Sequence, residues 1–116
     1  MNIEEIRNYC IAKKGVTESF PFNETTLVFK VMNKMFCLLS LDSARISLKN
    51  DPEKNEMLRA QYPAIIPGYH LNKTHWNTIE LNETVPPGLL QKMIDESYEI
   101  IIKSLPKKVQ KEYQQL

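Results

Sequence analysis

The apolar residues near the start of the chain recur at the spacing of an α-helix. The stripe that they form comprises Ile3, Ile6, Tyr9 and Cys10. Asn2 precedes this stripe, and Glu5 lies three residues after Asn2, which is the spacing of a capping box. Gly15 follows two lysines and is typical of a residue that ends a helix. We therefore predict that the chain opens with a helix.

Beyond Gly15 the pattern changes to the alternation of β-strands. Residues 25–31 and 34–40 both alternate, and Met32-Asn33 between them predicts a β-hairpin with a tight turn. The two faces of the first strand are Leu27, Phe29 and Val31 against Thr26, Val28 and Lys30. The two faces of the second strand are Met35, Cys37 and Leu39 against Phe36 and Leu38.

Three further segments are predicted to be strands, at residues 16–20, 45–49 and 76–81. The alternation is clearest at residues 45–49, where Ile46 and Leu48 should face the core. The residues expected to face solvent there are Arg45, Ser47 and Lys49.

Two more helices are predicted in the second half of the chain. Asp51-Pro52 has the form of a cap followed by a first-turn proline, and the short surface helix that it starts should end before Pro63. A long helix should run from Pro86-Pro87 to about Ser104. Its inner stripe comprises Leu90, Met93, Ile94, Ser97, Tyr98 and Ile101. Pro106 breaks this helix, and residues 107–115 can add one or two more turns.

The predicted order is helix, four strands, helix, strand, helix. Consecutive antiparallel strands with helices at both ends favour an α+β fold, with a single twisted antiparallel sheet and the N- and C-terminal helices packed on one face. The other face of the sheet should be partly open to solvent or to a partner. No repeat, linker or low-complexity tract interrupts the pattern, so we expect residues 1–116 to form a single domain.

Composition narrows the possible partners. The chain has 116 residues, is 42% hydrophobic and 25% charged, and carries a net charge of +1, so it is expected to fold and any basic site must be local. No signal peptide or membrane-spanning run is recognisable, and a cytoplasmic location is expected. Cys10 and Cys37 lie in apolar runs without metal-ligand spacing and are predicted to be buried free thiols.

Catalytic, metal and cofactor motifs are not recognisable in the sequence. No nucleophile elbow is present, and His70 and His75 lie five residues apart, which fits neither a helical metal pair nor a zinc finger. Gly15, Gly68 and Gly88 are the only glycines, so there is no glycine-rich phosphate loop. We expect no enzymatic activity, no metal and no cofactor.

Residues 67–77, with the sequence PGYHLNKTHWN, form the segment richest in possible contacts. Its side chains are of the kind that stack on planar partners, donate hydrogen bonds or contact anions. A purely structural interpretation is equally open. Pro67 and Gly68 would shape a rigid turn, and Asn72 or Asn77 would satisfy buried backbone groups, so that the loop seats Trp76 on the sheet.

Basic residues are distributed over the same half of the chain. Lys30 and Lys34 flank the hairpin turn, and Arg45 and Lys49 lie on the outer face of a nearby strand. With Lys73, His70 and His75 they would make a basic patch interleaved with Tyr69 and Trp76. Lysines at turns and outward strand positions are often only a solvated surface, and Trp76 is equally suited to the core.

The chain resembles the MmcQ/YjbR family of small bacterial proteins over nearly its whole length. The segments that carry the resemblance are residues 20–22, 28–31, 34–36, 46–49, 51–53, 62–65, 67–77 and 95–98, with residues 68–77 the most distinctive. One departure lies at the hairpin turn, where the family often has a glycine before the lysine and this chain has Asn33. Asparagine tolerates the left-handed conformation, so the turn should be retained.

The resemblance implies a frataxin-like, double-wing fold and a DNA-binding role, with the strands around Lys30/Lys34 and Arg45/Lys49 as wings. Iron handling, as in frataxins, would need clustered carboxylates on the first helix, where Glu4 and Glu5 are balanced by basic residues.

The predicted function is therefore non-catalytic binding of duplex DNA by a protein for which a monomer is favoured. The predicted DNA-binding residues are Lys30, Lys34, Arg45, Lys49, Tyr69, His70, Asn72, Lys73, His75 and Trp76. The alternative is a module that binds a protein or a small ligand, with the loop from Tyr69 to Trp76 as the wall of a pocket. A deep, apolar cleft beside that loop would favour the alternative.

Overall fold

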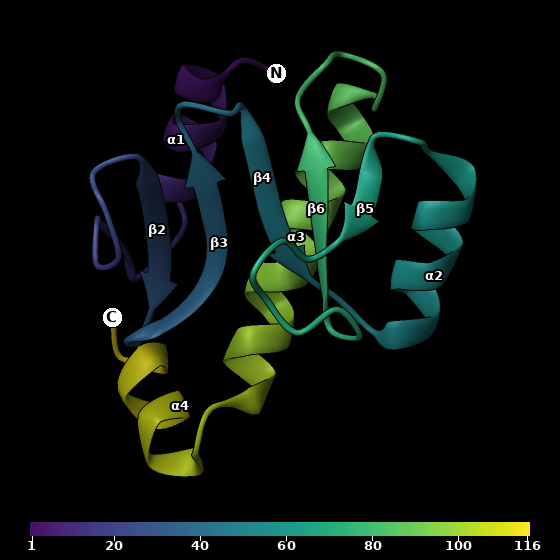
Figure 1. Cartoon of the computed structure of the whole chain (residues 1–116). Helices are drawn as coiled ribbons and strands as arrows, with labels where there is room; N and C mark the ends of the chain where they lie inside the picture. The colour runs from purple at the N-terminus through teal and green to yellow at the C-terminus, as the bar shows by residue number, and fades with distance from the viewer.

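Six strands form one antiparallel sheet in the computed structural model, which describes residues 1–116 (Figure 1). The strands are β1 (Val16–Ser19), β2 (Thr26–Val31), β3 (Lys34–Ser40), β4 (Arg45–Lys49), β5 (Ile65–Pro67) and β6 (Trp76–Glu80). Their order across the sheet is β1-β2-β3-β4-β6-β5, and every neighbouring pair is antiparallel.

Four helices complete the fold: α1 (Ile3–Ile11), α2 (Pro52–Gln61), α3 (Pro87–Ser104) and α4 (Lys107–Gln114). In Figure 1, α1 and α3 lie behind the sheet, α2 stands beside β5, and α4 lies below the sheet next to the C-terminus. The predicted α+β fold, with the terminal helices on one face of a single sheet, is therefore confirmed. None of the helices has the length and apolar character needed to cross a membrane.

The core lies between the sheet and the helices α1 and α3. All six residues of the predicted inner stripe of α3 are buried, as are Ile6 and Cys10 of α1. Leu27, Phe29 and Val31 of β2 face them from the sheet, as the alternation predicted. Burial of these side chains is the main stabilising contribution of the fold, at about 25 cal/mol for each Å² removed from water.

The predicted faces of β3 are wrong at Phe36. Phe29 pairs with Cys37 but Lys30 pairs with Met35, so Phe36 has no partner and forms a β-bulge. Because of this extra residue, Phe36 and Cys37 are both buried in the core. The ring of Phe36 packs edge to face on Tyr98 of α3, with centroids 5.3 Å apart.

Two of the predicted local signals are confirmed and one is wrong. Asn2 and Glu5 form the capping box of α1, with hydrogen bonds of 2.8 and 2.9 Å. Met32 and Asn33 both have positive φ, 49° and 66°, as a two-residue hairpin turn requires. The Asp51 side chain, in contrast, makes no cap hydrogen bond to α2. The carboxamide of Asn50 accepts from the Asp51 N–H instead.

Strand β5 was not predicted. It has only three residues, lies between two prolines, and pairs with β6 alone, so it offers too short a run for any period to appear. The predicted exposure of Ser47 is also wrong. Ser47 is on the outer face, as expected, but it is 8% exposed because loops on both sides of that face rise above it.

Cys10 of α1 and Cys37 of β3 are both buried and free, as predicted. Their sulfur atoms lie 4.0 Å apart in the core. Burial, with a smaller contribution from the neighbouring thiol, raises the pKa of Cys37 well above its usual value. The Cys37 thiol is therefore protonated at neutral pH and unreactive.

Candidate functional site

The structure divides the predicted DNA-binding residues between two parts of the sheet. β2 and β4 are both antiparallel to β3, so they run in the same direction and their last residues lie at the same end of the sheet. Lys30 and Lys49 are therefore found at that end, on the outer face, with Lys34 in the first position of β3. Arg45 lies at the opposite end of β4, across from Glu80.

Helix α4 lies beside the turn between β2 and β3, at this same end of the sheet (Figure 1). Gly15 shows how closely the chain approaches itself here, because a Cβ atom on Gly15 would lie 2.9 Å from Leu116, 3.7 Å from Val31 and 3.8 Å from Tyr113. Gly15 has a φ of 74°, so it supplies both the space and the backbone conformation of the turn between α1 and β1.

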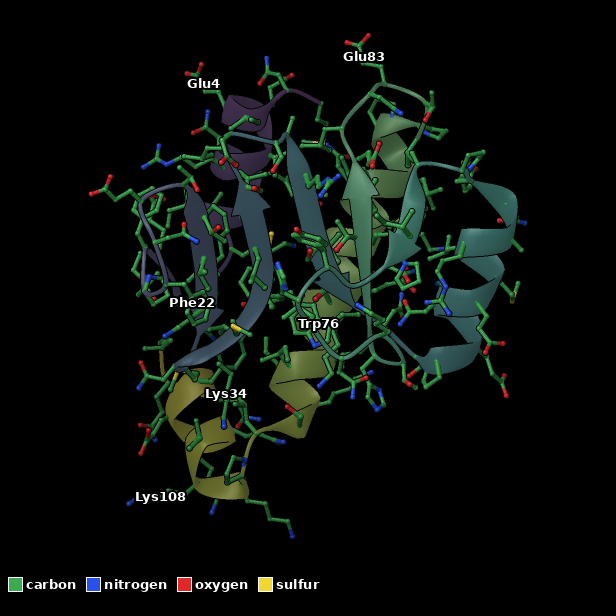
Figure 2. The ribbon with its side chains drawn as sticks, viewed as in Figure 1. Glu4, Phe22, Lys34, Trp76, Glu83 and Lys108 are labelled. Carbon is green, nitrogen blue, oxygen red and sulfur yellow. The ribbon has the colours of Figure 1, made fainter.

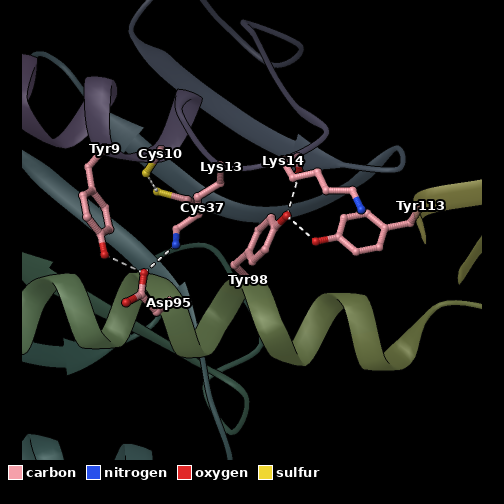
Figure 3. Close-up of polar contacts among 8 residues, drawn as sticks. All are labelled: Tyr9, Cys10, Lys13, Lys14, Cys37, Asp95, Tyr98 and Tyr113. Atoms are coloured by element: carbon pink, nitrogen blue, oxygen red, sulfur yellow. Dashed lines mark hydrogen bonds and ion pairs between the residues drawn. The ribbon is translucent and has the colours of Figure 1, made fainter. Parts of the chain in front are cut away.

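A polar network joins α4 to α3 and to the turn between α1 and β1 (Figure 3). The Tyr98 hydroxyl donates to the Lys14 carbonyl at 2.6 Å and lies 2.8 Å from the Tyr113 hydroxyl. Since the single Tyr98 proton is already used, Tyr113 is the donor in the second bond. The Lys14 ammonium lies 4.4 Å from the centroid of the Tyr113 ring. Helix α4 is thus fixed in place and carries its lysines in a defined position.

We call this region the basic end, and it comprises Lys14, Lys30, Lys34, Lys49, Lys107, Lys108 and Lys111. Lys34 and Lys108 project from it in Figure 2. None of the seven takes part in an ion pair. Sequence reasoning missed Lys14 and the three lysines of α4. The lysines after Pro106 are evident in the sequence as a local positive charge, but nothing in the sequence indicates that they lie beside the hairpin turn.

Four carboxylates gather at the opposite end of the molecule, whereas Glu112 of α4 lies among the lysines of the basic end and Asp51 follows Lys49. Glu4 and Glu83 project there in Figure 2, and Glu80 and Asp42 lie on the same side of the sheet, at the end of β6 and after β3. The net charge of +1 therefore conceals a partial separation of charge along the strand direction, with an excess of lysines at one end. Such a separation produces a local potential that net charge alone does not predict.

Lys13 is adjacent to the basic end but is held internally. Its ammonium lies 2.5 Å from the Asp95 carboxylate, which also accepts from the Tyr9 hydroxyl at 2.8 Å (Figure 3). The ammonium also lies 5.0 Å from the Tyr9 ring and 5.1 Å from the Tyr98 ring. Burial, followed by the hydrogen bond to Asp95, raises the pKa of Tyr9 to about 12. This cluster ties α1 to α3 and leaves Lys13 unavailable to a partner.

The loop between β5 and β6 has the purely structural role that was one of the two interpretations of this segment. The Asn72 carboxamide accepts from the backbone of Thr74 and His75 at 3.0 and 3.1 Å. The Lys73 ammonium donates to the Gly68 carbonyl at 2.8 Å. Trp76 is only 8% exposed and seats the loop on the sheet, so its ring is not free to stack on a base.

Asn77, on the inner face of β6, anchors the other side of this loop. Its side chain donates to the Asn55 carbonyl at 3.2 Å and accepts from Arg59 at 2.7 Å. Asn55 in turn donates to the carbonyls of Asn50 and Thr74, both at 3.1 Å. The predicted use of Asn72 and Asn77 to satisfy backbone groups is therefore confirmed.

The remaining predicted residues, Arg45, Tyr69 and His70, line a cleft on the uncovered face of the sheet. The cleft has a volume of about 660 Å³. Its floor is formed by outward side chains of β2, β3, β4 and β6, and its walls by the segments around Phe22 and Tyr69. Ten of its fourteen lining residues are polar, so it is not the apolar cleft that would have favoured the alternative function. In the sequence, the cleft is indicated by hydroxyl residues at outward strand positions, namely Thr26, Ser40, Ser47 and Thr78.

Comparison with protein families gives one match that spans most of the chain. The family model described as YjbR matches residues 11–100. The protein YjbR of Escherichia coli K12, described as uncharacterized, is 34% identical over 113 residues, which cover 96% of both chains. The protein YbdF of Escherichia coli O157:H7, also described as uncharacterized, is 37% identical over 94 residues, 79% of this chain and 77% of YbdF.

Solved structures agree with these sequence matches. The crystal structure of Deinococcus radiodurans protein DR2400, with a domain described as DUF419, superimposes with a TM-score of 0.91 and 40% identity. The match covers 97% of this chain and 88% of that one. A crystal structure of a Pseudomonas syringae protein gives a TM-score of 0.76 and 27% identity, over 86% of this chain and 98% of that one.

Proposed function

The chain belongs to the YjbR family, and for this member we propose non-catalytic binding of duplex DNA through the basic end. The observation that carries the proposal is the gathering of seven lysines, all without an ion pair, around α4 and the β2–β3 turn. Lysines that have no carboxylate partner within the protein are free to replace the counterions of a phosphate backbone.

The shape of the basic end supports contact with phosphates more than reading of bases. Lys107, Lys108 and Lys111 are exposed along the short helix α4, and Lys34 is exposed at the turn beside it. The seven cations of the basic end are all lysines, whose ammonium groups contact phosphates as point charges without the planar fork of an arginine. The proposed binding is therefore independent of sequence and strongly dependent on salt.

The proposal modifies the predicted set of contacts. Lys30, Lys34 and Lys49 remain in it. Arg45 and Lys73 do not, because Arg45 lies 3.5 Å from the Glu80 carboxylate and Lys73 holds the loop. The contacts that replace them come from α4 and from Lys14.

The test is a fluorescence anisotropy titration of a random duplex at two salt concentrations. The affinity of the unmodified protein should fall steeply with salt, with a slope of about 0.9 for each phosphate neutralised. Lys108→Gln should reduce the slope by about one unit, and Lys30→Ala/Lys49→Ala by about two.

Lys92→Gln is the matched control. Lys92 is exposed on the second turn of α3, has no ion pair, and its replacement changes the net charge by the same amount. The slope of this variant should equal that of the unmodified protein. Equal slopes for Lys92→Gln and Lys108→Gln, or no binding of duplex even at low salt, would reject the proposal.

A further inference from the structure

The cleft on the uncovered face of the sheet has features that DNA binding at the basic end does not use. Two neighbouring hydroxyl groups lie at its floor, with Ser47 Oγ 2.8 Å from Thr78 Oγ1. Thr78 also accepts from the backbone N–H of Tyr69 at 2.9 Å, which fixes the wall of the cleft to its floor. The volume of about 660 Å³ falls within the range of small-molecule sites.

Arg45 lies in this cleft, and its only ion pair, with Glu80, is a loose one that leaves most of its donors free. The other two arginines are hydrogen-bonded within the protein, Arg7 to Glu18 at 2.7 Å and Arg59 to Asn77 at 2.7 Å. Arg45 makes no hydrogen bond of this kind, and its nearest carboxylate oxygen, on Glu80, lies at 3.5 Å. Its guanidinium carbon lies 5.2 Å from the centroid of the Tyr69 ring, so stacking holds the group in position. A planar, pre-positioned guanidinium with free donors is suited to a carboxylate.

Asp42 supplies the opposite charge from the turn between β3 and β4. One of its oxygens, Oδ1, accepts from the hydroxyls of Ser40 and Ser43 at 3.1 and 3.2 Å. These hydrogen bonds lower the pKa of Asp42, which keeps the carboxylate ionised. No side chain donates to the other oxygen, Oδ2, which faces a ligand in the cleft with free acceptor capacity.

Apolar groups stand beside these two charges. Phe22 and Tyr69, which are 62% and 56% exposed, belong to opposite walls of the cleft. Leu38 lies on the floor, in the row formed with Ser47 and Thr78, and Leu71 follows the Tyr69 wall. The lining thus carries one guanidinium, one carboxylate and a separate apolar surface.

We propose that this cleft binds a free amino acid with an apolar side chain, with the carboxylate on Arg45, the ammonium on Asp42 and the side chain against Phe22, Leu38 and Leu71. A ligand with no net charge matches a lining in which the charges of Arg45 and Asp42 balance. An anion without an ammonium group would be repelled by Asp42, and a cation without a carboxylate would make no use of the free donors of Arg45.

The test uses three probes in calorimetric or NMR titrations, namely leucine, leucinamide and N-acetylleucine. Leucine should bind, and each blocked analogue should bind at least about tenfold more weakly, because one charge-assisted contact is lost. Arg45→Gln should lower the affinity for leucine by about the same factor and leave the affinity for leucinamide unchanged. Asp42→Asn should weaken the binding of leucine and strengthen that of N-acetylleucine, because the carboxylate that repels this anion is removed.

Two controls keep the result interpretable. Arg45→Lys retains the charge without the planar fork and should recover part of the affinity, and a melting curve for each variant verifies that it is folded. Lys92→Gln should bind leucine as the unmodified protein does. Equal affinity for the three probes, loss of leucine binding in Lys92→Gln, or no binding of leucine at millimolar concentration would overturn the proposal.

Discussion

The Ser97 hydroxyl donates to the Phe36 carbonyl at 2.5 Å, and so joins the centre of α3 to the bulged residue of β3. The same oxygen accepts from the backbone N–H of Lys49 at 2.9 Å. A bulge removes backbone groups from the sheet ladder, and buried groups without partners are costly. Ser97, which is fully buried, supplies the missing partners of two strands at once.

Replacing Ser97 by alanine should therefore destabilise the fold. Ser97→Ala leaves a buried carbonyl and a buried N–H without partners, and the expected loss is about 1–3 kcal/mol in the free energy of unfolding. Urea denaturation measures this loss. Ser104→Ala, in the same helix, is the control, because Ser104 is exposed and bonds only to Ile101 of its own turn. A similar loss in both variants would show that Ser97 has no special role at the bulge.

The hairpin turn makes a second prediction. Asn33 has a φ of 66°, a conformation that costs most residues about 1 kcal/mol but suits asparagine and glycine. Asn33→Ala should lower the midpoint of chemical denaturation, and Asn33→Gly should leave it unchanged or raise it. If alanine and glycine at this position give the same midpoint, the left-handed backbone is not what selects asparagine here.

The third prediction concerns alkaline pH and Tyr9. The pKa of Tyr9 is raised to about 12, and the pKa of Tyr98 is raised mainly by burial. The folded protein thus holds these protons more tightly than the unfolded chain, where a phenol titrates near pKa 10. Their stabilising contribution is fully present below about pH 10 and is lost as the pH rises toward 12.

Tyr9→Phe removes one of these two groups and its hydrogen bond to Asp95. The variant should be less stable at neutral pH, and its stability should decline less steeply above about pH 10. Denaturation midpoints at a series of pH values give both quantities. Parallel declines in the two proteins would mean that Tyr9 does not contribute to the alkaline loss.

Long and regular segments were predictable from the sequence. Helix α3 repeats its apolar stripe over eighteen residues, so the pattern determined its position and its buried face. The β2–β3 turn was equally clear, because two alternating runs flank a pair that includes asparagine. In both cases the structure is determined by residues that are close together in the sequence.

Features that depend on distant parts of the chain were not predictable. Phe36 turns inward because Ser97 and Tyr98, some sixty residues later, satisfy its carbonyl and pack on its ring. Arg45 and Lys49 are four residues apart on one face of β4, and sequence reasoning assigned them to one site. The structure places Arg45 in the cleft and Lys49 at the basic end, because a five-residue strand spans the sheet from one end to the other.

The short strand β5 limits how the sheet can grow. It ends at Pro67, which has no N–H to offer, and only three of its residues pair with β6. The other border, β1, has four residues, and Glu18 within it is occupied by an ion pair with Arg7. Neither border offers a long flat template for a strand of another chain, so the fold carries a built-in protection against edge-to-edge aggregation.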